Sequence, residues 1–159
     1  KKVFYHSLER YPLAMADAMQ LNYPQQIEKR AACPVEQDQE RLTVLFRQLH
    51  QSPWETPAVI TPSFTLLKEE ADFSQPEQFQ SPCRYDLIYF DAFAPEKQPE
   101  MWQEAIFKKL YTLCSDNAIL TTYCAKGAVR RILQSAGFTV ERLPGPPGKR
   151  EMLRARKVK

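Results

Sequence analysis

The stretch from Tyr85 to Trp102 constrains the fold most, because its character changes abruptly at Asp91. Its first part contains a continuous apolar run, Leu87 to Phe90. An apolar run bounded by turn residues is typical of a strand that is buried on both faces of a parallel sheet. The part after Asp91 is a short loop with aromatic and proline residues. Since ligands of open α/β sheets bind outside the carboxyl ends of the strands, this loop is a candidate site.

The remaining chain alternates between apolar patterns typical of strands and of helices, and it ends in two strands. The expected strands are residues 3–8, 58–61, 64–69, 85–90, 118–123, 138–142 and 151–155. The expected helices are residues 12–23, 36–50, 100–113 and 128–136, with a connection at 24–35 and a turn at 115–117. This order predicts one α/β domain over residues 1–159, with a mostly parallel sheet and a C-terminal antiparallel hairpin.

The composition limits the classes of protein to which the chain can belong. The chain has 159 residues and a net charge of +3, which permits an anionic partner without requiring one. Its last residues, from Lys149 onward, are strongly basic, which suits either a phosphate-facing tail or a solvated terminus. The four cysteines lack metal-ligand spacing, so we expect free thiols and no metal site. With no signal peptide or membrane-length apolar run, a cytoplasmic protein without a membrane segment is expected.

Acidic residues at strand ends are candidate nucleotide contacts. Glu9 follows the first expected strand, where an acid can bind a ribose diol, although it can equally be a polar strand end. Asp72 lies beside Phe73, so the pair can receive an adenine amine and stack its ring, or form a solvated acidic turn. Trp102 can face the crevice or belong to the core. A glycine-rich turn after the first strand is absent, since the first glycine is Gly127.

The loop at Asp91 resembles a known signature. The pattern Asp-Ala-Phe-Ala-Pro-x-Lys-x-Pro-x-Met-Trp, residues 91–102, is similar to that of the bacterial tRNA wobble-uridine methyltransferases. Members of this family convert 5-aminomethyl-2-thiouridine to its methylaminomethyl form with S-adenosylmethionine, either as stand-alone proteins or fused to an FAD-dependent oxidoreductase. Residues 4–13, 121–131 and 137–153 agree with it as well, so the resemblance covers essentially the whole chain, in the stand-alone form.

The resemblance implies a Rossmann-like class I S-adenosylmethionine-dependent methyltransferase fold, with tRNA as substrate and an FAD-dependent oxidoreductase as the partner that acts earlier in the pathway. It implies Asp91 as the catalytic residue. The cofactor-binding residues that it implies are Glu9, Arg10, Asp72, Phe73 and Asp91. The substrate-binding residues that it implies are Phe93, Pro95, Lys97, Arg130, Lys149 and Arg150.

One departure from the family leads to a further hypothesis. The family has a first strand and a glycine-rich cofactor loop upstream of the segment that matches residues 2–9. Without that strand, the strands that end near Glu9 and Asp91 would face each other across a gap with unpaired backbone groups, which is costly. We therefore expect this chain to be the N-terminally truncated, C-terminal two-thirds of a larger methyltransferase domain. The alternatives are a nicotinamide-dependent oxidoreductase on the same scaffold and a non-catalytic fragment that binds RNA or a protein.

Overall fold

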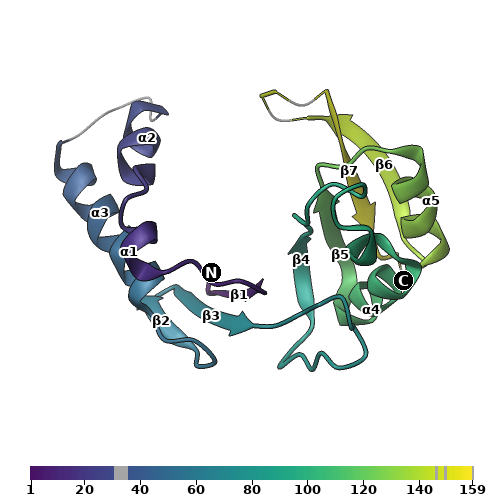
Figure 1. Ribbon diagram of the computed structural model, residues 1–159, viewed down its shortest axis with the longest axis horizontal. Helices are drawn as coiled ribbons and strands as arrows, with labels where there is room; N and C mark the ends of the chain where they lie inside the picture. The colour runs from purple at the N-terminus through teal and green to yellow at the C-terminus, as the bar shows by residue number, and fades with distance from the viewer. Residues whose placement is uncertain (31–35, 146, 149, 159) are drawn as a thin grey trace. The chain divides into compact units, whose positions relative to one another are not determined.

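The computed structural model describes residues 1–30, 36–145, 147–148 and 150–158. The chain divides into two compact units, residues 1–72 and residues 73–159, and each unit is built around its own sheet (Figure 1). We describe the units separately. The single domain expected over residues 1–159 stays a prediction.

The sheet of the first unit has three strands in the order β1-β3-β2. The strands are β1 (Val3–Glu9), β2 (Ala58–Thr61) and β3 (Phe64–Glu70). β1 pairs with β3 in parallel, and β2 forms an antiparallel hairpin with β3. The β-branched and aromatic residues that open β1 suit a pleated, half-buried surface. The three strands expected in this region are confirmed.

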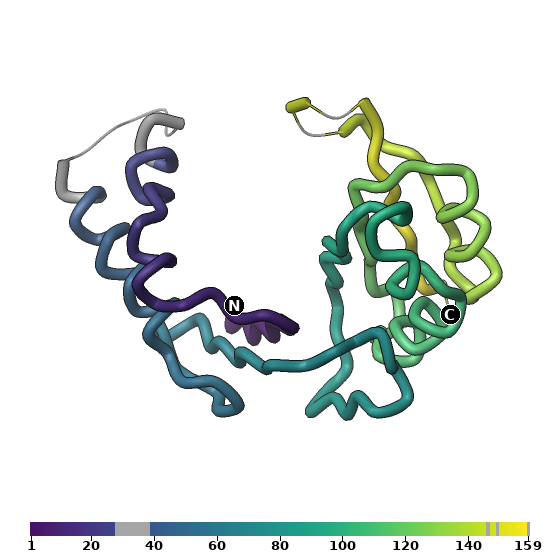
Figure 2. The backbone as a smooth tube through the Cα atoms, in the orientation of Figure 1, coloured from purple at the N-terminus to yellow at the C-terminus, as the bar shows by residue number. Residues whose placement is uncertain are grey.

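Three helices follow β1 and precede β2: α1 (Met15–Ala18), α2 (Tyr23–Arg30) and α3 (Glu36–Gln51). α2 lies beside α3 (Figure 2). The ring centres of Tyr23 and Phe46, one on each helix, are 6.2 Å apart. The expected helix at 36–50 is confirmed, and the helix expected at 12–23 is confirmed only over α1. The connection expected at 24–30 is wrong, because α2 occupies it. Pro24 cannot continue a helix from the preceding turn, whereas it fits the first turn of a new one. Residues 31–35 lie outside the described ranges.

Lys68 on β3 joins the end of α3 to the sheet. Its ammonium Nζ donates to the carbonyl oxygen of His50 at 2.8 Å and lies 4.8 Å from the centre of the Trp54 ring. A cation near the carbonyl end of a helix is favourable, and an aromatic face adds a cation–π attraction. Burial lowers the pKa of the Lys68 ammonium, because the charged form loses water contacts.

The sheet of the second unit has four strands in the order β4-β5-β7-β6. The strands are β4 (Tyr85–Tyr89), β5 (Cys114–Thr122), β6 (Thr139–Pro144) and β7 (Glu151–Arg156). The helices are η1 (Pro99–Trp102), α4 (Glu104–Leu113) and α5 (Gly127–Ser135). β4 and β5 are parallel, and β7 is antiparallel to both neighbours, which confirms the expected C-terminal hairpin.

The core of the second unit lies between its sheet and helices α4 and α5, which are drawn along the same face of the sheet (Figure 1). Its largest fully buried side chains are Ile106, Phe107, Cys114, Leu120, Val129, Leu133 and Leu153. Trp102 also belongs to this core: it is 4% exposed, and its ring meets that of Phe90 edge-on at 5.2 Å. Of the two roles left open for Trp102, the core role is therefore confirmed.

Two local expectations in the second unit are wrong. The turn expected at 115–117 lies inside β5, where Asn117 has a positive φ and the pairing register with β4 shifts. The turn-forming residues thus make an irregularity within β5, and they do not form a separate turn before that strand. β4 is also not buried on both faces, because it is an edge strand and Tyr89 remains 63% exposed.

β1 and β4 are the strands that the truncation hypothesis singles out. Each is an edge strand of its sheet. The hypothesis requires this position, but whether an upstream segment supplies a further strand stays a prediction.

Gly137 ends α5 in the left-handed conformation expected for it, with a φ of +106°. The amides of Gly137 and Phe138 donate to the carbonyls of Gln134 and Leu133, and a Cβ at Gly137 would lie 3.1 Å from the Tyr111 ring. We expect Gly137→Ala to lower the free energy of unfolding by about 1–3 kcal/mol, through backbone strain and this close contact. Urea denaturation followed by circular dichroism measures it.

Two other glycines are matched controls. Gly148 has a φ of +86° with open space around it, so Gly148→Ala adds strain without a steric contact. Gly127 has no positive φ, and its nearest neighbour is the flexible end of Arg131 at 3.5 Å. The loss should be largest at Gly137, smaller at Gly148 and absent at Gly127; an equal loss at all three would contradict this explanation.

Candidate active site

The loop that follows β4 has a fixed backbone. The amide of Phe93 donates to Gln98 Oε1 at 3.2 Å, and its carbonyl oxygen accepts from Trp102 Nε1 at 2.7 Å. The amides of Lys97 and Gln98 both donate to the carbonyl of Ala94, at 2.7 and 3.0 Å. These bonds close a compact turn and tie it to the buried tryptophan. The loop is therefore rigid although it is exposed.

The side chains of this loop face solvent on that rigid backbone. Asp91 is exposed, and the Phe93 ring is 72% exposed. Lys97 is exposed as well, while Pro95 is half-buried and restricts the backbone at its own position. An exposed aromatic ring on a fixed backbone offers a flat apolar surface at little entropic cost. A carboxylate two residues away adds a hydrogen-bond acceptor.

The loop after β5 supports the loop after β4. The two strands are parallel, and the amide of Phe90 donates to the Thr121 carbonyl at 2.9 Å, so their carboxyl ends lie side by side. Tyr123 donates its hydroxyl to the Ala92 carbonyl at 2.6 Å. Lys126 forms an ion pair with Glu96. Two side chains of the loop after β5, Tyr123 and Lys126, thus hold the loop after β4 in place.

Tyr123 lies in an environment that disfavours its ionised form. Burial raises the pKa of the Tyr123 hydroxyl, and the negative charges of Cys124 and Asp91 raise it further. Because a raised pKa keeps the proton on the oxygen, Tyr123 remains a hydrogen-bond donor to Ala92 across the neutral pH range.

In the first unit, the carboxyl ends of β1 and β3 carry the candidate cofactor residues. The amide of Tyr11 donates to Glu9 Oε1 at 2.9 Å, and Arg10 forms an ion pair with Asp72 at 3.1 Å. The amide of Ala71 also donates to the carbonyl of Glu9 at 3.1 Å, which links the two strand ends. Glu9, Arg10 and Asp72 are thus held together.

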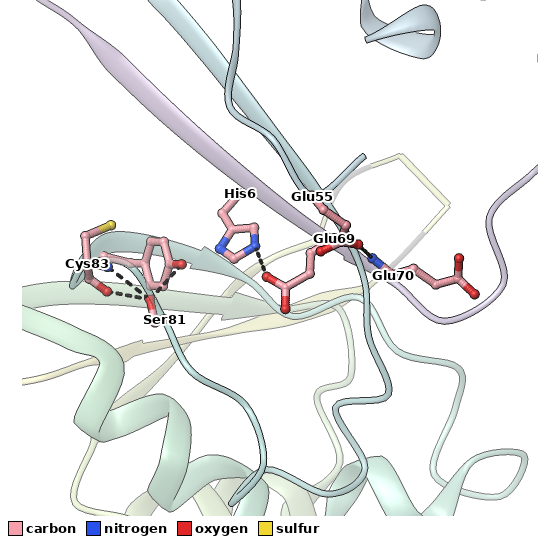
Figure 3. A network of polar contacts seen from close by, with 7 residues as sticks. His6, Glu55, Glu69, Glu70, Ser81 and Cys83 are labelled. Carbon is pink, nitrogen blue, oxygen red and sulfur yellow. Dashed lines mark hydrogen bonds and ion pairs between the residues drawn. The ribbon is translucent and has the colours of Figure 1, made fainter. Parts of the chain in front are cut away.

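Two further polar contacts organise these strands and are drawn in Figure 3. His6 Nε2 lies 2.9 Å from Glu69 Oε2, and the amide of Glu70 donates to Glu55 Oε1 at 2.8 Å. Figure 3 also shows a contact of the second unit, in which the Ser81 hydroxyl donates to the Cys83 carbonyl at 2.6 Å. These bonds stabilise the strands and the segments that connect them.

The residues at the end of β1 fit an S-adenosylmethionine ribose by their donor and acceptor chemistry. A carboxylate has about four acceptor positions, and Glu9 is exposed with one bond to its own backbone, so capacity remains for a diol. The Asp72 carboxylate forms an ion pair with Arg10. The Phe73 ring is buried and packs edge-on against Phe79, with 5.2 Å between the ring centres. Their contacts with adenine stay predictions.

The structure groups some of the candidate residues and separates others. Glu9, Arg10 and Asp72 belong to the first unit, whereas Phe73 and the loop from Asp91 to Lys97 belong to the second. Arg130 is exposed on α5, and Arg150 is exposed before β7. Lys149 lies outside the described residues. The proposed roles of all these residues stay predictions.

Sequence reasoning missed the supporting residues Tyr123, Lys126 and Gln98. A signal existed for Tyr123, because it follows the strand that neighbours β4 in a parallel sheet. Lys126 and Gln98 gave no such signal, because their contacts depend on the loop conformations. No group of metal-binding side chains and no helix fit to cross a membrane occurs among the residues that the structure describes.

The sequence profile of an S-adenosyl-L-methionine-dependent methyltransferase family matches residues 71–158, which include the loops after β4 and β5. The chain belongs to this family. This membership confirms the family's cofactor and the class I α/β fold, and it decides against the nicotinamide-dependent alternative.

Relatives of similar sequence carry a more specific name. The chain is 41% identical over 90 residues to the "tRNA 5-methylaminomethyl-2-thiouridine biosynthesis bifunctional protein MnmC" of Ralstonia nicotianae, over 57% of this chain and 13% of that protein. It is 30% identical over 153 residues to the protein of the same name from Paraburkholderia phymatum, over 96% of this chain and 22% of that protein. The chain thus spans about a fifth or less of the length of these relatives.

A solved structure has the same fold. The crystal structure of MNMC2 from Aquifex aeolicus matches 97% of this chain and 43% of its own, with a TM-score of 0.66 and 19% identity. The likeness extends over both units.

The environment of Tyr123 leads to a prediction about the pH at which its hydroxyl ionises. We expect its hydroxyl to ionise above the ordinary tyrosine pKa of about 10. The raised pKa stabilises the folded protein, and this contribution is fully present below a pH of about 10. It is lost as the pH rises further, because the unfolded chain releases the proton first. The difference in tyrosinate absorbance between the wild type and Tyr123→Phe measures the titration. A midpoint below that of the other tyrosines would contradict the prediction.

Proposed function

We propose that this chain takes part in transferring a methyl group from S-adenosyl-L-methionine to the aminomethyl group of a modified wobble uridine in tRNA. The observation that carries the proposal is the rigid loop after β4, which presents the Asp91 carboxylate and the Phe93 ring to solvent. Family membership supports methyl transfer, and the names of the relatives support the tRNA nucleoside.

Asp91 supplies what the acceptor amine needs. S-adenosyl-L-methionine provides, when bound, a methyl group activated by a positively charged sulfur. An alkylamine is mostly protonated at neutral pH, so its ammonium must first release a proton to water before the nitrogen can attack; methylation of the neutral amine then gives a new ammonium ion. The Asp91 carboxylate accepts a hydrogen bond from the amine and stabilises the positive charge that develops on nitrogen. The rigid loop keeps the carboxylate in place, which lowers the entropic cost of the reaction.

Phe93 and Pro95 hold the base. RNA-binding proteins commonly stack unpaired bases on aromatic side chains, and enzymes that modify a base take it out of its stack. The exposed Phe93 ring has the surface for this contact. Lys97, Arg130, Lys149 and Arg150 bind phosphate oxygens or the modified uridine in this proposal, since cationic side chains provide most of the affinity for a nucleic-acid backbone.

Partner and location belong to the same proposal. The relatives are named bifunctional proteins, which supports a second activity in the same pathway. We propose that an FAD-dependent oxidoreductase acts before this enzyme and that both act on tRNA in the cytoplasm. We also propose that the two units form a single methyltransferase domain.

Asp91→Asn tests the proposed catalytic role. The amide keeps the shape of the side chain but removes its charge, so we expect methyl transfer to fall by about 100-fold or more. The affinity for S-adenosylmethionine should change by no more than a few fold. The assay is transfer of labelled methyl groups to tRNA from a strain that accumulates the aminomethyl nucleoside, with calorimetry for the cofactor.

Asp86→Asn is the matched control, because Asp86 is an exposed acid on β4 itself. It should retain activity. Loss of cofactor binding in Asp91→Asn would contradict the catalytic role and leave Asp91 only its role in binding the cofactor. Wild-type protein that binds the cofactor and leaves the aminomethyl nucleoside unmodified would refute the tRNA assignment.

Glu9→Gln tests the ribose contact. Hydrogen bonds to a charged group contribute about 1.5–3 kcal/mol, so we expect cofactor affinity to fall about 10- to 100-fold. Glu70→Gln is the control, because Glu70 is the partner of Glu9 in the β1–β3 register. Calorimetric titration measures both. Equal losses in the two variants would show a general charge effect instead of a contact with the ribose.

A further inference from the structure

The two consecutive carbonyl groups between Asp91 and Ala94 are held from different elements. Trp102 of η1 donates to the carbonyl of Phe93, and Tyr123 at the end of β5 donates to the carbonyl of Ala92. Holding these two carbonyls fixes the two peptide planes on either side of the Phe93 Cα, so it sets the direction in which the Phe93 ring points. Asp91 precedes Ala92 directly, so its backbone adjoins the first of these planes.

The Tyr123 bond is stronger than the other contact between the two loops. It is 2.6 Å long and partly buried, which favours a well-formed hydrogen bond. The ion pair between Lys126 and Glu96 is exposed, with side chains 50% and 64% accessible, so water and salt weaken it. Of these two contacts, Tyr123 therefore contributes more to the conformation of the β4 loop.

We propose that Tyr123 is a positioning residue of the methyl-transfer site: its hydroxyl bond to Ala92 orients the Phe93 ring and fixes the backbone next to Asp91, so that both side chains can receive the aminomethyl base. This inference rests on the proposed function. Tyr123 touches the backbone of the loop, and it acts on the reaction through Asp91 and Phe93.

Tyr123→Phe in the full-length protein tests the inference, because it removes the hydroxyl and keeps the ring. Hydrogen exchange followed by mass spectrometry reports on the amides of Phe93, Lys97 and Gln98, which close the turn. We expect them to exchange about three- to tenfold faster, the change that follows from losing one hydrogen bond, while the amides of α4 and α5 keep their rates.

Kinetics separate positioning from binding. In Tyr123→Phe, kcat for methyl transfer should fall about three- to tenfold, with changes below about twofold in cofactor Kd and tRNA KM. Tyr111→Phe is the matched control, because Tyr111 lies on α4 and packs on Phe138, away from the loop. It should leave loop exchange and kcat unchanged. Lys126→Ala should have a smaller effect on loop exchange than Tyr123→Phe.

These experiments distinguish failure of this inference from failure of the proposed function. Unchanged loop exchange in Tyr123→Phe overturns the inference, whatever the activity. Faster exchange throughout the second unit overturns it as well, because it shows a general loss of stability. Faster loop exchange with unchanged kcat in an active enzyme also overturns it. If the wild type methylates no tRNA, the proposed function fails, and with it the role in methyl transfer, while loop exchange still decides whether Tyr123 holds the loop.

Discussion

The parallel pairing of β4 with β5 is the interaction on which the candidate site depends. It brings the carboxyl ends of two strands together, so the loop that begins with Asp91 lies against the loop that begins with Tyr123. The fully buried side chains of α4, α5 and β7 keep this pair of strands in place from one side. Since the core supports the strands, the loops can remain exposed without becoming mobile, and their side chains are available for a large substrate.

The two units differ in charge. Residues 1–72 contain more acidic than basic side chains, whereas residues 73–159 contain a clear excess of lysine and arginine. A polyanion is therefore attracted to the unit that carries the rigid loop. The acidic strand ends of the first unit repel phosphates and suit a ribose diol, which donates hydrogen bonds. This division agrees with the proposal that cationic residues of the second unit bind the nucleic acid.

Much of the fold was predictable from the sequence, because apolar periodicity directly records which residues face a core. This periodicity predicted the strands of both sheets, α3 and α5. The errors arose where tertiary contacts override local signals: Ser115 to Asn117 form an irregularity inside β5, and a new helix begins beside Pro24. The candidate site was found as a loop, since Asp91 ends an apolar run. Its supports were not, because the bonds of Tyr123 and Gln98 join residues whose spacing in the sequence has no periodic pattern.

The edge position of β1 also bears on how the protein behaves at high concentration. The unpaired backbone of an edge strand is a template for pairing with another chain, and many proteins protect such edges with lysine, proline or a bulge. β1 contains neither lysine nor proline, and its residues Val3, Phe4 and Tyr5 are exposed. Any segment that pairs with β1 therefore also protects this strand from pairing with a second copy of the chain.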